Sequence, residues 1–377
     1  MKIVLFANTD WYLYNFRLPL IKSLISQGNQ VVVIAPEGYY SKKIENEGIK
    51  VVCLRFKRTQ TNIFNELGLV LELVRIFFKI KPDLIHVFTL RVVFHAAVAA
   101  LLTRSKLIAS ITGLGSSFIS KKPLSLLIRF ISMILFSILF SSKNRKIITQ
   151  NKDDCKIILK YTIVPKSNIA IIRGSGVDRK FFKAKLCQEL NPTSYKILMV
   201  SRILKDKGVI DFVKSSSYFV GQKNVSFFHV GGFDYGNPES LTKELLDKFK
   251  KYSNVTFIGH RDNVQNIMLE STVLVLPSLR EGFPKTIMEA MSCKLPVITY
   301  DSTGCRDSIL HGKNGFIIPK SRPDLIAKYL KIILRNTEIR KRMSKSAYFY
   351  SKNNYRADLI DKLTINLYKK MIADVKS

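Results

Sequence analysis

The feature that most constrains the fold is a regular alternation of strand-like and helix-like segments, which occurs twice along the chain. The first series opens at Lys2–Ala7 and closes at Lys146–Thr149. The second opens at Lys196–Val200 and closes at Gly315–Ile318. Short apolar runs separated by helix-length segments are typical of a parallel sheet with helices on both faces. We therefore expect an α/β protein with two facing, Rossmann-like domains and a cleft between them.

The stretch between the two series predicts the domain boundary. Residues Asp178–Ser194 contain no strand-like run. We expect an N-terminal domain over residues 1–180, a C-terminal domain over 195–350, and a basic helical segment over 351–377 that packs back on the N-terminal domain. In parallel sheets of this type, ligands bind beyond the carboxyl ends of the strands. The loops at those ends are the predicted site.

The chain is strongly basic, with 61 Lys and Arg against 28 Asp and Glu and a net charge of +33 over 377 residues. Such a surface attracts nucleic acid, an anionic membrane or phosphorylated small molecules. No zinc-finger, RNA-recognition or basic-zipper pattern accompanies the charge, which disfavours nucleic acid. The five cysteines form no CxxC pair, so neither a zinc site nor a disulfide framework is predicted.

One segment is more apolar than most soluble helices. Leu124–Phe140 has Arg129 as its single charged residue, and basic residues flank both of its ends. As a helix it would reach about 26 Å, short of the roughly 30 Å of a bilayer core. Basic flanks on both sides favour a helix lying in the interface of an anionic membrane, over a buried or a crossing helix. A second apolar segment, Leu67–Ile80, is better explained as an ordinary domain helix.

The most specific motif is REGFPKTIMEAM, residues 280–291. Pro284 is favoured as the first residue of a helix, and the N–H groups of a first helical turn attract phosphate. Glu281 comes just before this helix, where its carboxylate can reach a ligand. Glu289 falls among apolar residues, where a carboxylate needs partners such as sugar hydroxyls. A solvent-facing helix glutamate is the alternative.

A second motif, SRILKDKG at residues 201–208, follows the first strand of the second series. Its cations Arg202 and Lys207 fall in a strand-to-helix loop, at the edge of the sheet where ligands bind. Arg offers a planar fork and Lys a point charge, so the two together could clamp a diphosphate. Alone the pair is not specific, because the chain is rich in lysine.

Taken together, these motifs resemble the retaining glycosyltransferases of family 4. The resemblance rests on Glu281 and Glu289 with EGFP at residues 281–284, and on the upstream SRILKDKG; it covers nearly the whole chain and implies the GT-B fold. FRLP at residues 16–19 and GLGS at 113–116 are similar to the subgroup acting on polyprenyl-diphosphate-linked sugars. That subgroup includes bacterial N-acetylgalactosaminyltransferases and enzymes of O-antigen and capsule synthesis.

The resemblance implies a role for each matching residue. The catalytic set would be Arg202 and Lys207 at the donor diphosphate and Glu281 at the donor sugar. The remaining donor-binding residues would be Glu289 at the ribose, Ile258 at the base, Gly232 at the nucleotide, and Phe283, Pro284, Lys285 and Thr286 at the sugar and phosphate. The acceptor and loop residues would be Arg17, Thr112, Gly113 and Gly115.

The resemblance also implies chemistry. No DxD sequence occurs, so we expect neither a metal nor a cofactor, the nucleotide sugar being a substrate. Preorganised cations and helix amides would stabilise the charge that develops on the departing diphosphate. Thr112 stands where many family members have a histidine, and a threonine is no base near neutral pH, so the general base is left open.

We therefore expect a peripheral enzyme on the cytoplasmic face of the bacterial inner membrane. Its donor would be a nucleotide diphosphate sugar, with UDP favoured over GDP, and its acceptor a lipid-diphosphate saccharide. The N-terminal apolar run meets Asp10 too early for a secretory signal, which fits this location. Two alternatives are a nucleotide-sugar epimerase of the same fold and a nucleic-acid-binding protein. The sugar and the linkage are not specified by the sequence.

Overall fold

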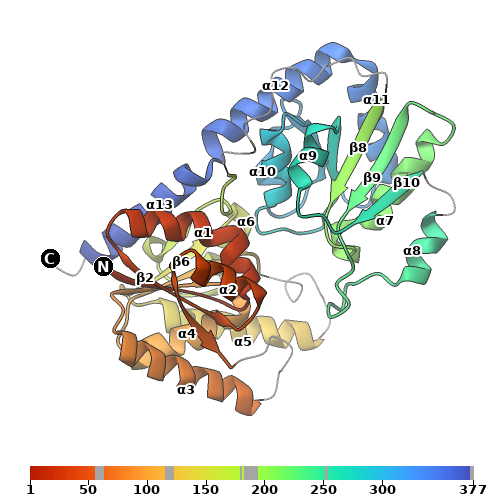
Figure 1. The fold of residues 1–377 in the computed structure, drawn as a ribbon. Coiled ribbons are helices and arrows are strands. Elements are labelled where there is room, and N and C mark those ends of the chain that lie inside the picture. Colours follow the sequence, from red (N-terminus) through yellow and green to blue (C-terminus); the bar gives the residue numbers. More distant parts are fainter. Residues whose placement is uncertain (56–62, 115–122, 179–180, 182–193, 251–253, 374–377) are drawn as a thin grey trace. The chain divides into compact units, whose positions relative to one another are not determined.

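The computed structural model describes residues 1–55, 63–114, 123–178, 181, 194–250 and 254–373 (Figure 1). The chain forms two compact units, the first made of Met1–Ser175 with Ala357–Ser377 and the second of Gly176–Arg356. The expected linker, Asp178–Ser194, lies mostly outside the described residues. The C-terminal segment that returns to the first unit begins at Ala357, a few residues after the expected position 351.

The first unit is built on a seven-stranded parallel sheet with the order β3-β2-β1-β4-β5-β6-β7. Every connection between its strands is a crossover, as parallel pairing requires. Because all strands run the same way, their carboxyl ends share one edge of the sheet. The strands are β1 (Lys2–Ala7), β2 (Gln30–Pro36), β3 (Lys50–Leu54), β4 (Leu84–Phe88), β5 (Leu107–Ile111), β6 (Arg145–Thr149) and β7 (Ile169–Ile171).

Helices cover both faces of this sheet. Alternate residues of β1 divide between two apolar clusters: Val4 and Phe6 join one, Ile3 and Leu5 the other. This period of two is what a strand buried on both faces should show. The first cluster lies under α3 (Ile63–Ile80), α4 (Leu90–Leu102), α5 (Pro123–Phe140) and α6 (Lys152–Tyr161). The second lies under α1 (Asp10–Ser26), α2 (Tyr39–Asn46) and α13 (Ala357–Ala373). The short helix η2 (Lys166–Asn168) immediately precedes β7.

The second unit is built on a six-stranded parallel sheet with the order β10-β9-β8-β11-β12-β13. Its first strand, β8, sits in the middle of the sheet, so the chain winds outward from β8 in both directions. Loops near that switch point are where such sheets bind ligands. The strands are β8 (Tyr195–Val200), β9 (Val225–Val230), β10 (Val255–Gly259), β11 (Val273–Leu276), β12 (Val297–Tyr300) and β13 (Gly315–Ile318).

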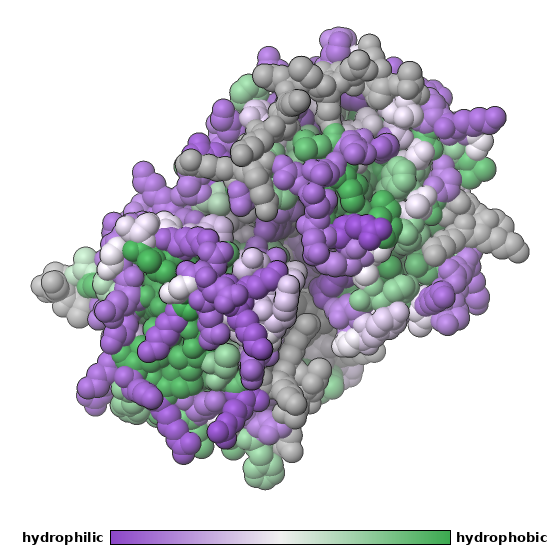
Figure 2. All heavy atoms as spheres, viewed as in Figure 1, coloured by the Kyte–Doolittle hydropathy of each residue, from purple (hydrophilic) through white to green (hydrophobic). Residues whose placement is uncertain are grey.

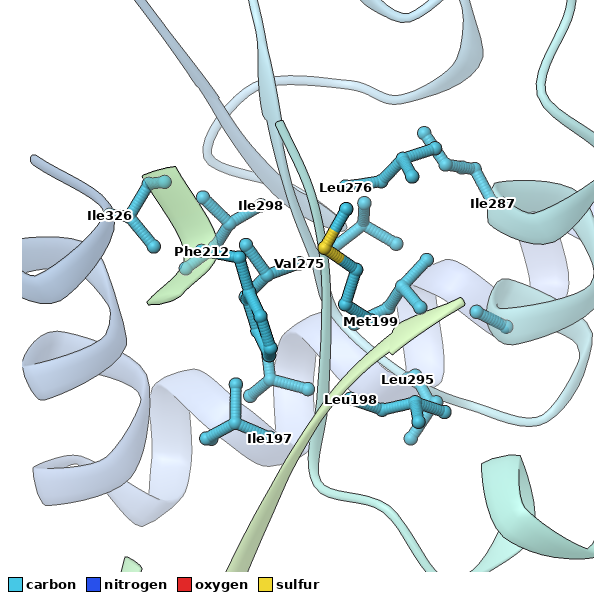
Figure 3. Close-up of a cluster of buried hydrophobic side chains, with 14 of the residues drawn as sticks. Ile197, Leu198, Met199, Phe212, Val275, Leu276, Ile287, Leu295, Ile298 and Ile326 are labelled. Carbon is cyan, nitrogen blue, oxygen red and sulfur yellow. The ribbon is translucent and has the colours of Figure 1, made fainter. Parts of the chain in front are cut away.

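The core of the second unit fixes the helices that carry the candidate site. Figure 3 shows Phe212 of α7, Ile287 of α10 and Ile326 of α11 packed with apolar side chains of β8, β11 and β12. The α-helices are α7 (Val209–Ser216), α8 (Lys243–Lys250), α9 (Val264–Leu269), α10 (Lys285–Ser292), α11 (Pro323–Arg335) and α12 (Thr337–Asn354). The short 3₁₀ helices are η4 (Lys205–Lys207), η5 (Ser217–Phe219) and η6 (Arg306–Ser308).

The surface reflects the basic composition. Hydrophilic side chains are spread over the face of both units seen in Figure 2, and apolar areas lie between them on each unit. On this face, hydrophilic residues are therefore not confined to one unit.

Candidate active site

The carboxyl ends of the strands of the second unit are joined into one framework by backbone hydrogen bonds between their loops. Each loop donates to, or accepts from, the loop that follows a neighbouring strand, which restricts how far any of them can move. The bonds run from Ile203 N–H to Gly232 O, from Gly231 N–H to Gly259 O, from Leu279 N–H to Asp206 O and from Glu281 N–H to Thr303 O, all at 2.8–2.9 Å.

Two glycines allow these loops to approach so closely. Gly231 has a φ of +140°, and a Cβ built on it would lie 1.8 Å from the carbonyl oxygen of Ser201. Gly304 has a φ of +78°, and its Cβ would lie 2.4 Å from the carbonyl oxygen of Glu281. Any other residue would be strained and would clash with backbone. At Gly232, which the resemblance assigned to the nucleotide, the nearest atom to a built Cβ is 4.0 Å away, so Gly231 is the glycine that the loop packing requires.

The framework brings Lys207 and Glu281 together from loops 74 residues apart. The Lys207 Nζ lies 2.7 Å from Glu281 Oε1, with side chains 13% and 19% exposed. Burial by itself would lower the pKa of Lys207, but the carboxylates of Glu281 and Asp206 outweigh it and the pKa is raised. Burial raises the pKa of Asp206 while Lys207 lowers it. Lys207 is therefore a fixed cation at this strand end.

Arg202 provides a second cation on the same loop. Its guanidinium pairs with the carboxylate of Asp234, which lies in the loop after β9, and the Asn237 side-chain amide donates to the same carboxylate oxygen at 3.4 Å. The Arg202 side chain remains 51% exposed. A guanidinium held at one end of its fork and open to solvent elsewhere is suited to bind an anion.

The helix α10 begins at Lys285, with Pro284 as its N-cap residue, so the helix starts one residue later than predicted. The carboxylate of Glu289 lies 3.6 Å from the Lys285 ammonium and its side chain is only 16% exposed, which contradicts the alternative of a solvent-facing glutamate. The Phe283 side chain is buried against Tyr355, with ring centroids 5.5 Å apart. Phe283 can therefore offer only its backbone to a ligand. Thr286 is partly exposed in the first turn.

The end of β10 places Ile258 half-buried against the core, and the following His260 is exposed beside Asp262. A residue that the sequence did not single out lies next to this strand. His229 of β9 is buried, bonds through Nε2 to the Ser201 hydroxyl at 3.2 Å, and has its pKa lowered by burial to about 4. It is therefore neutral and supports the loop that carries Arg202.

In the first unit, Arg17 is buried inside α1. Its guanidinium donates to the Tyr12 hydroxyl at 3.0 Å and stacks over the Phe88 ring at 4.5 Å. Asp361 of α13 is close by; burial raises the pKa of this carboxyl to about 7, and Arg17 acts in the opposite direction. Arg17 therefore joins α1, β4 and α13, and is only 4% exposed.

The loop after β5 holds Thr112 and Gly113, with Gly113 at a φ of +132°. Gly115 lies outside the described residues. Within β5, the Ser110 hydroxyl bonds to Nε2 of His86 at 2.7 Å, and Nδ1 of His86 bonds to the hydroxyl of Tyr368. Burial holds the pKa of His86 well below its ordinary value. Sequence analysis missed this bridge because Tyr368 is 282 residues away from its partner.

The helix α5 is, among the described helices, the one long and apolar enough by length and composition to cross a membrane. It buries Met133, Phe136, Leu139 and Phe140 against the unit. The rest of the helix is largely exposed, so the alternative of a buried helix is wrong. Its exposed large apolar side chains are Leu124, Leu126, Leu127, Ile128, Phe130, Ile131, Ile134 and Ile138.

The helix α3 has apolar side chains on both its inner and its outer face. Its inner face packs as predicted for a domain helix, through Leu69, Leu73 and Phe77. Its outer face was not predicted to be apolar, yet large side chains on it are 58–76% exposed. These are Phe64, Leu67, Leu71 and Phe78.

Among the described residues, no group of three or more His, Cys, Asp or Glu side chains is placed to hold a metal ion.

Comparison with known proteins supports the resemblance. At 25% identity the chain aligns over the full length of both proteins with N,N'-diacetylbacillosaminyl-diphospho-undecaprenol alpha-1,3-N-acetylgalactosaminyltransferase of Campylobacter jejuni. It is 24% identical to the capsular polysaccharide biosynthesis glycosyltransferase CapM of Staphylococcus aureus, over 90% of each chain. It is also 24% identical to UDP-Gal:alpha-D-GlcNAc-diphosphoundecaprenol alpha-1,3-galactosyltransferase of Escherichia coli, over 74% of this chain and 72% of that protein.

Solved structures show the same fold. A glycosyltransferase from Rickettsia africae has a TM-score of 0.78 and 18% identity, with 98% of each chain covered. Anabaena HepE in complex with UDP-glucose has a TM-score of 0.79 and 19% identity, covering 98% of this chain and 99% of that one. The comparisons give no support to an epimerase or a nucleic-acid-binding protein.

Family models account for both units. The model described as "Glycosyl transferase 4-like" matches residues 2–151, within the first unit, and the model described as "Glycosyl transferases group 1" matches residues 181–349, within the second. The chain belongs to the glycosyltransferase family that these two models describe, and it has the GT-B fold.

Proposed function

We propose that this glycosyltransferase moves a sugar from a UDP-sugar to a polyprenyl-diphosphate-linked saccharide, with retention of anomeric configuration and without a metal or cofactor. The observation that carries the proposal is the partly buried pair Lys207–Glu281, next to Arg202 on the same loop framework. The names of the Campylobacter and Escherichia relatives support the acceptor class, and the UDP-bound Anabaena neighbour supports the nucleotide.

On the donor side, Lys207 and Arg202 bind the diphosphate. An ammonium has three N–H donors, so the bond from Lys207 to Glu281 is compatible with further bonds to phosphate oxygens. Glu281 accepts hydrogen bonds from donor-sugar hydroxyls, and Glu289 does the same for the ribose. The backbone around Phe283 to Thr286, at the start of α10, contacts the sugar and phosphate.

The remaining donor contacts come from neighbouring strand ends. The backbone at Ile258 contacts the base, and Gly232 lies beside the nucleotide. In the first unit, Thr112 and Gly113 contact the acceptor, together with Gly115. Arg17 is buried and holds α1, the helix that follows β1, in place. It therefore acts on the acceptor side by positioning this helix and not by contacting the acceptor.

In the reaction, the anomeric C–O bond breaks and its electron pair passes to the departing diphosphate. Lys207, Arg202 and the start of α10 stabilise that charge as it develops. The acceptor hydroxyl attacks the same face of the sugar, and a departing phosphate oxygen takes its proton. This route requires no basic side chain at Thr112.

The proposal places the enzyme on the cytoplasmic face of the membrane that holds its lipid acceptor. Two observations support this association: the exposed apolar side chains of α5 and α3, and the net charge of +33. Apolar side chains embed in the interface while cations attract anionic headgroups.

The test is transfer from a panel of nucleotide sugars to a short polyprenyl-diphosphate sugar, beside a Glu281→Ala control. Transfer from one UDP-sugar, lost in the control and unchanged by a metal chelator, is the expected result. The anomeric configuration of the product, read by NMR, tests retention. An inverted product, dependence on a divalent metal, or no binding of any nucleotide would each contradict the part of the proposal that it addresses.

A further inference from the structure

A pocket of about 730 Å³ lies at the amino ends of β1, β2 and β3, where α3 ends. The proposed transfer chemistry uses the carboxyl ends of the strands, so this pocket is separate from the candidate active site. Its volume falls in the range of small-molecule sites. Its aliphatic lining includes Ile25, Val32, Ile49, Val52, Ile76 and Ile80.

The polar part of the lining combines three lysines with the neutral Asn29 and Gln30, so all of its charged groups are cations. Lys50 and Lys79 line the pocket with exposed side chains, and neither forms a salt bridge with a described residue. Lys2 also lines it, and its ammonium donates to the carbonyl of Ile80 at 2.9 Å. The nearby carboxylate of Asp83 accepts from the backbone N–H of Lys2. An aliphatic cavity with lysines at its opening fits a ligand with a hydrocarbon part and an anionic part.

The helix α3 contributes residues both to this pocket and to the surface that we propose to lie on the membrane. Ile76, Lys79 and Ile80 line the pocket, while Phe78, between them in sequence, is 58% exposed on the outer face of the helix. Residues two apart in a helix point to opposite sides, so the pocket and the apolar outer face lie on opposite sides of α3.

We propose that this pocket binds one hydrocarbon chain of an anionic phospholipid from the bilayer, with the phosphate beside Lys50 and Lys79. The occupant is a membrane phospholipid because the pocket offers both apolar volume and cations, and because α3, which contributes to its lining, also carries the proposed membrane face. Binding of one lipid would fix the orientation of the first unit on the bilayer. The inference rests on the proposed membrane association and is independent of the transfer chemistry.

The test uses the full chain and dihexanoyl-phosphatidylglycerol as a monomeric probe, titrated calorimetrically. We expect saturable binding of one lipid per protein, at least tenfold weaker binding of dihexanoyl-phosphatidylcholine, and no binding of inorganic phosphate at the same concentrations. Equal affinity for the two lipids would overturn the role of the lysines. Phosphate binding as tight as that of the lipid would overturn the role of the apolar pocket.

Two variants act on different parts of the pocket. Val52→Phe fills the cavity and keeps the charges, and Lys50→Gln with Lys79→Gln removes the charges and keeps the cavity. Each should weaken phosphatidylglycerol at least fivefold, with unchanged transfer to a soluble acceptor analogue. Lys345→Gln, at an exposed lysine of α12, is the matched control and should change nothing. Because the charge variant removes only exposed groups, it remains informative if Val52→Phe does not fold.

A third variant separates this pocket from membrane association in general. Leu67→Gln changes the outer face of α3 and leaves the pocket lining intact, so it should weaken binding to phosphatidylglycerol vesicles without affecting the monomeric lipid. Unchanged monomer affinity in both pocket variants would overturn the inference. Wild-type protein that binds monomeric lipid but ignores anionic vesicles would support the pocket and contradict the proposed membrane association.

Discussion

On α3 and α5 of the first unit, large apolar side chains face solvent, whereas at the strand ends of the second unit charged side chains are partly withdrawn from it. Phe64 of α3 and Leu124 of α5 are 76% and 68% exposed, while Lys207 and Glu281 are 13% and 19% exposed. Both arrangements are costly for a protein alone in water. The difference supports the proposal that the two units meet different environments, the first a lipid surface and the second an anionic ligand.

The largest expected effect comes from removing the partly buried cation Lys207 of the second unit. Lys207→Met keeps the length of the side chain and deletes the charge that would stabilise the departing diphosphate. Loss of one such group should lower kcat about 100-fold or more. Lys205→Met, at the exposed lysine two residues earlier, is the matched control and should keep most of the activity. Equal activity of the two variants would show that the strand-end charge is not used in transfer.

The same loop framework predicts a large stability effect at one glycine. Gly231→Ala would force a Cβ to within 1.8 Å of a carbonyl oxygen at a φ of +140°, so the loops must separate. We expect a loss of about 2 kcal/mol in the free energy of unfolding, measured with urea. Gly221→Ala, at a φ of +86° with no atom within 4 Å of the built Cβ, controls for the backbone strain alone. A loss as large at Gly221 would remove the case for tight loop packing.

Removing a charge from the second unit should reduce transfer, whereas adding charge to the apolar helices of the first unit should reduce membrane binding. Leu127→Asp with Ile131→Asp places two carboxylates on the exposed face of α5. Binding to anionic vesicles should fall about tenfold, since buried apolar area and attraction to the lipid both decrease. The urea midpoint should stay the same because both positions face solvent. Phe349→Asp on α12 of the second unit, 48% exposed, should leave vesicle binding intact. Equal loss at Phe349 would mean that neither unit has a dedicated lipid face.

The sequence predicted those features of the two units that depend on a local pattern of residues. Alternating apolar runs identified every strand of both sheets except β7, which has only three residues. The motifs placed Lys207 in a strand-to-helix loop and Glu281 just before a helix, but did not predict that these two loops are neighbours. Pro284 was assigned to the helix start with an error of one residue. These features are local because strands, caps and strand-end loops are each encoded within a few residues.

Other features of the two units depend on packing between segments that are far apart in the sequence. The pattern of α3 is apolar around most of its circumference, so only the position of the sheet shows that Leu73 is inside and Leu71 outside. The pairing of Arg202 with Asp234 joins two loops whose spacing carries no motif. Of the adjacent glycines 231 and 232, sequence cannot tell which one faces a carbonyl oxygen. Such facts are set by tertiary geometry and not by local propensity.

The smallest expected effect concerns the buried histidine behind the Arg202 loop. Burial lowers the pKa of His229 to about 4, below the ordinary value near 6.5, so the unfolded chain takes up a proton at a pH where the folded chain does not. Stability is then fully present above pH 6.5 and declines as the pH falls toward 4, by about 1 kcal/mol between pH 8 and pH 6. His229→Gln should show a smaller decline in urea unfolding over this range, while His260→Gln, at an exposed histidine, should follow the wild type. In the first unit, the buried His86 adds a decline of the same sign, whereas the raised pKa of Asp361 increases stability as the pH falls through about 7. The contribution of His229 is therefore isolated only by comparing variants. If His229→Gln kept the full wild-type slope, the pH dependence would belong to the first unit alone, and the strand-end framework of the second unit would not depend on a neutral imidazole.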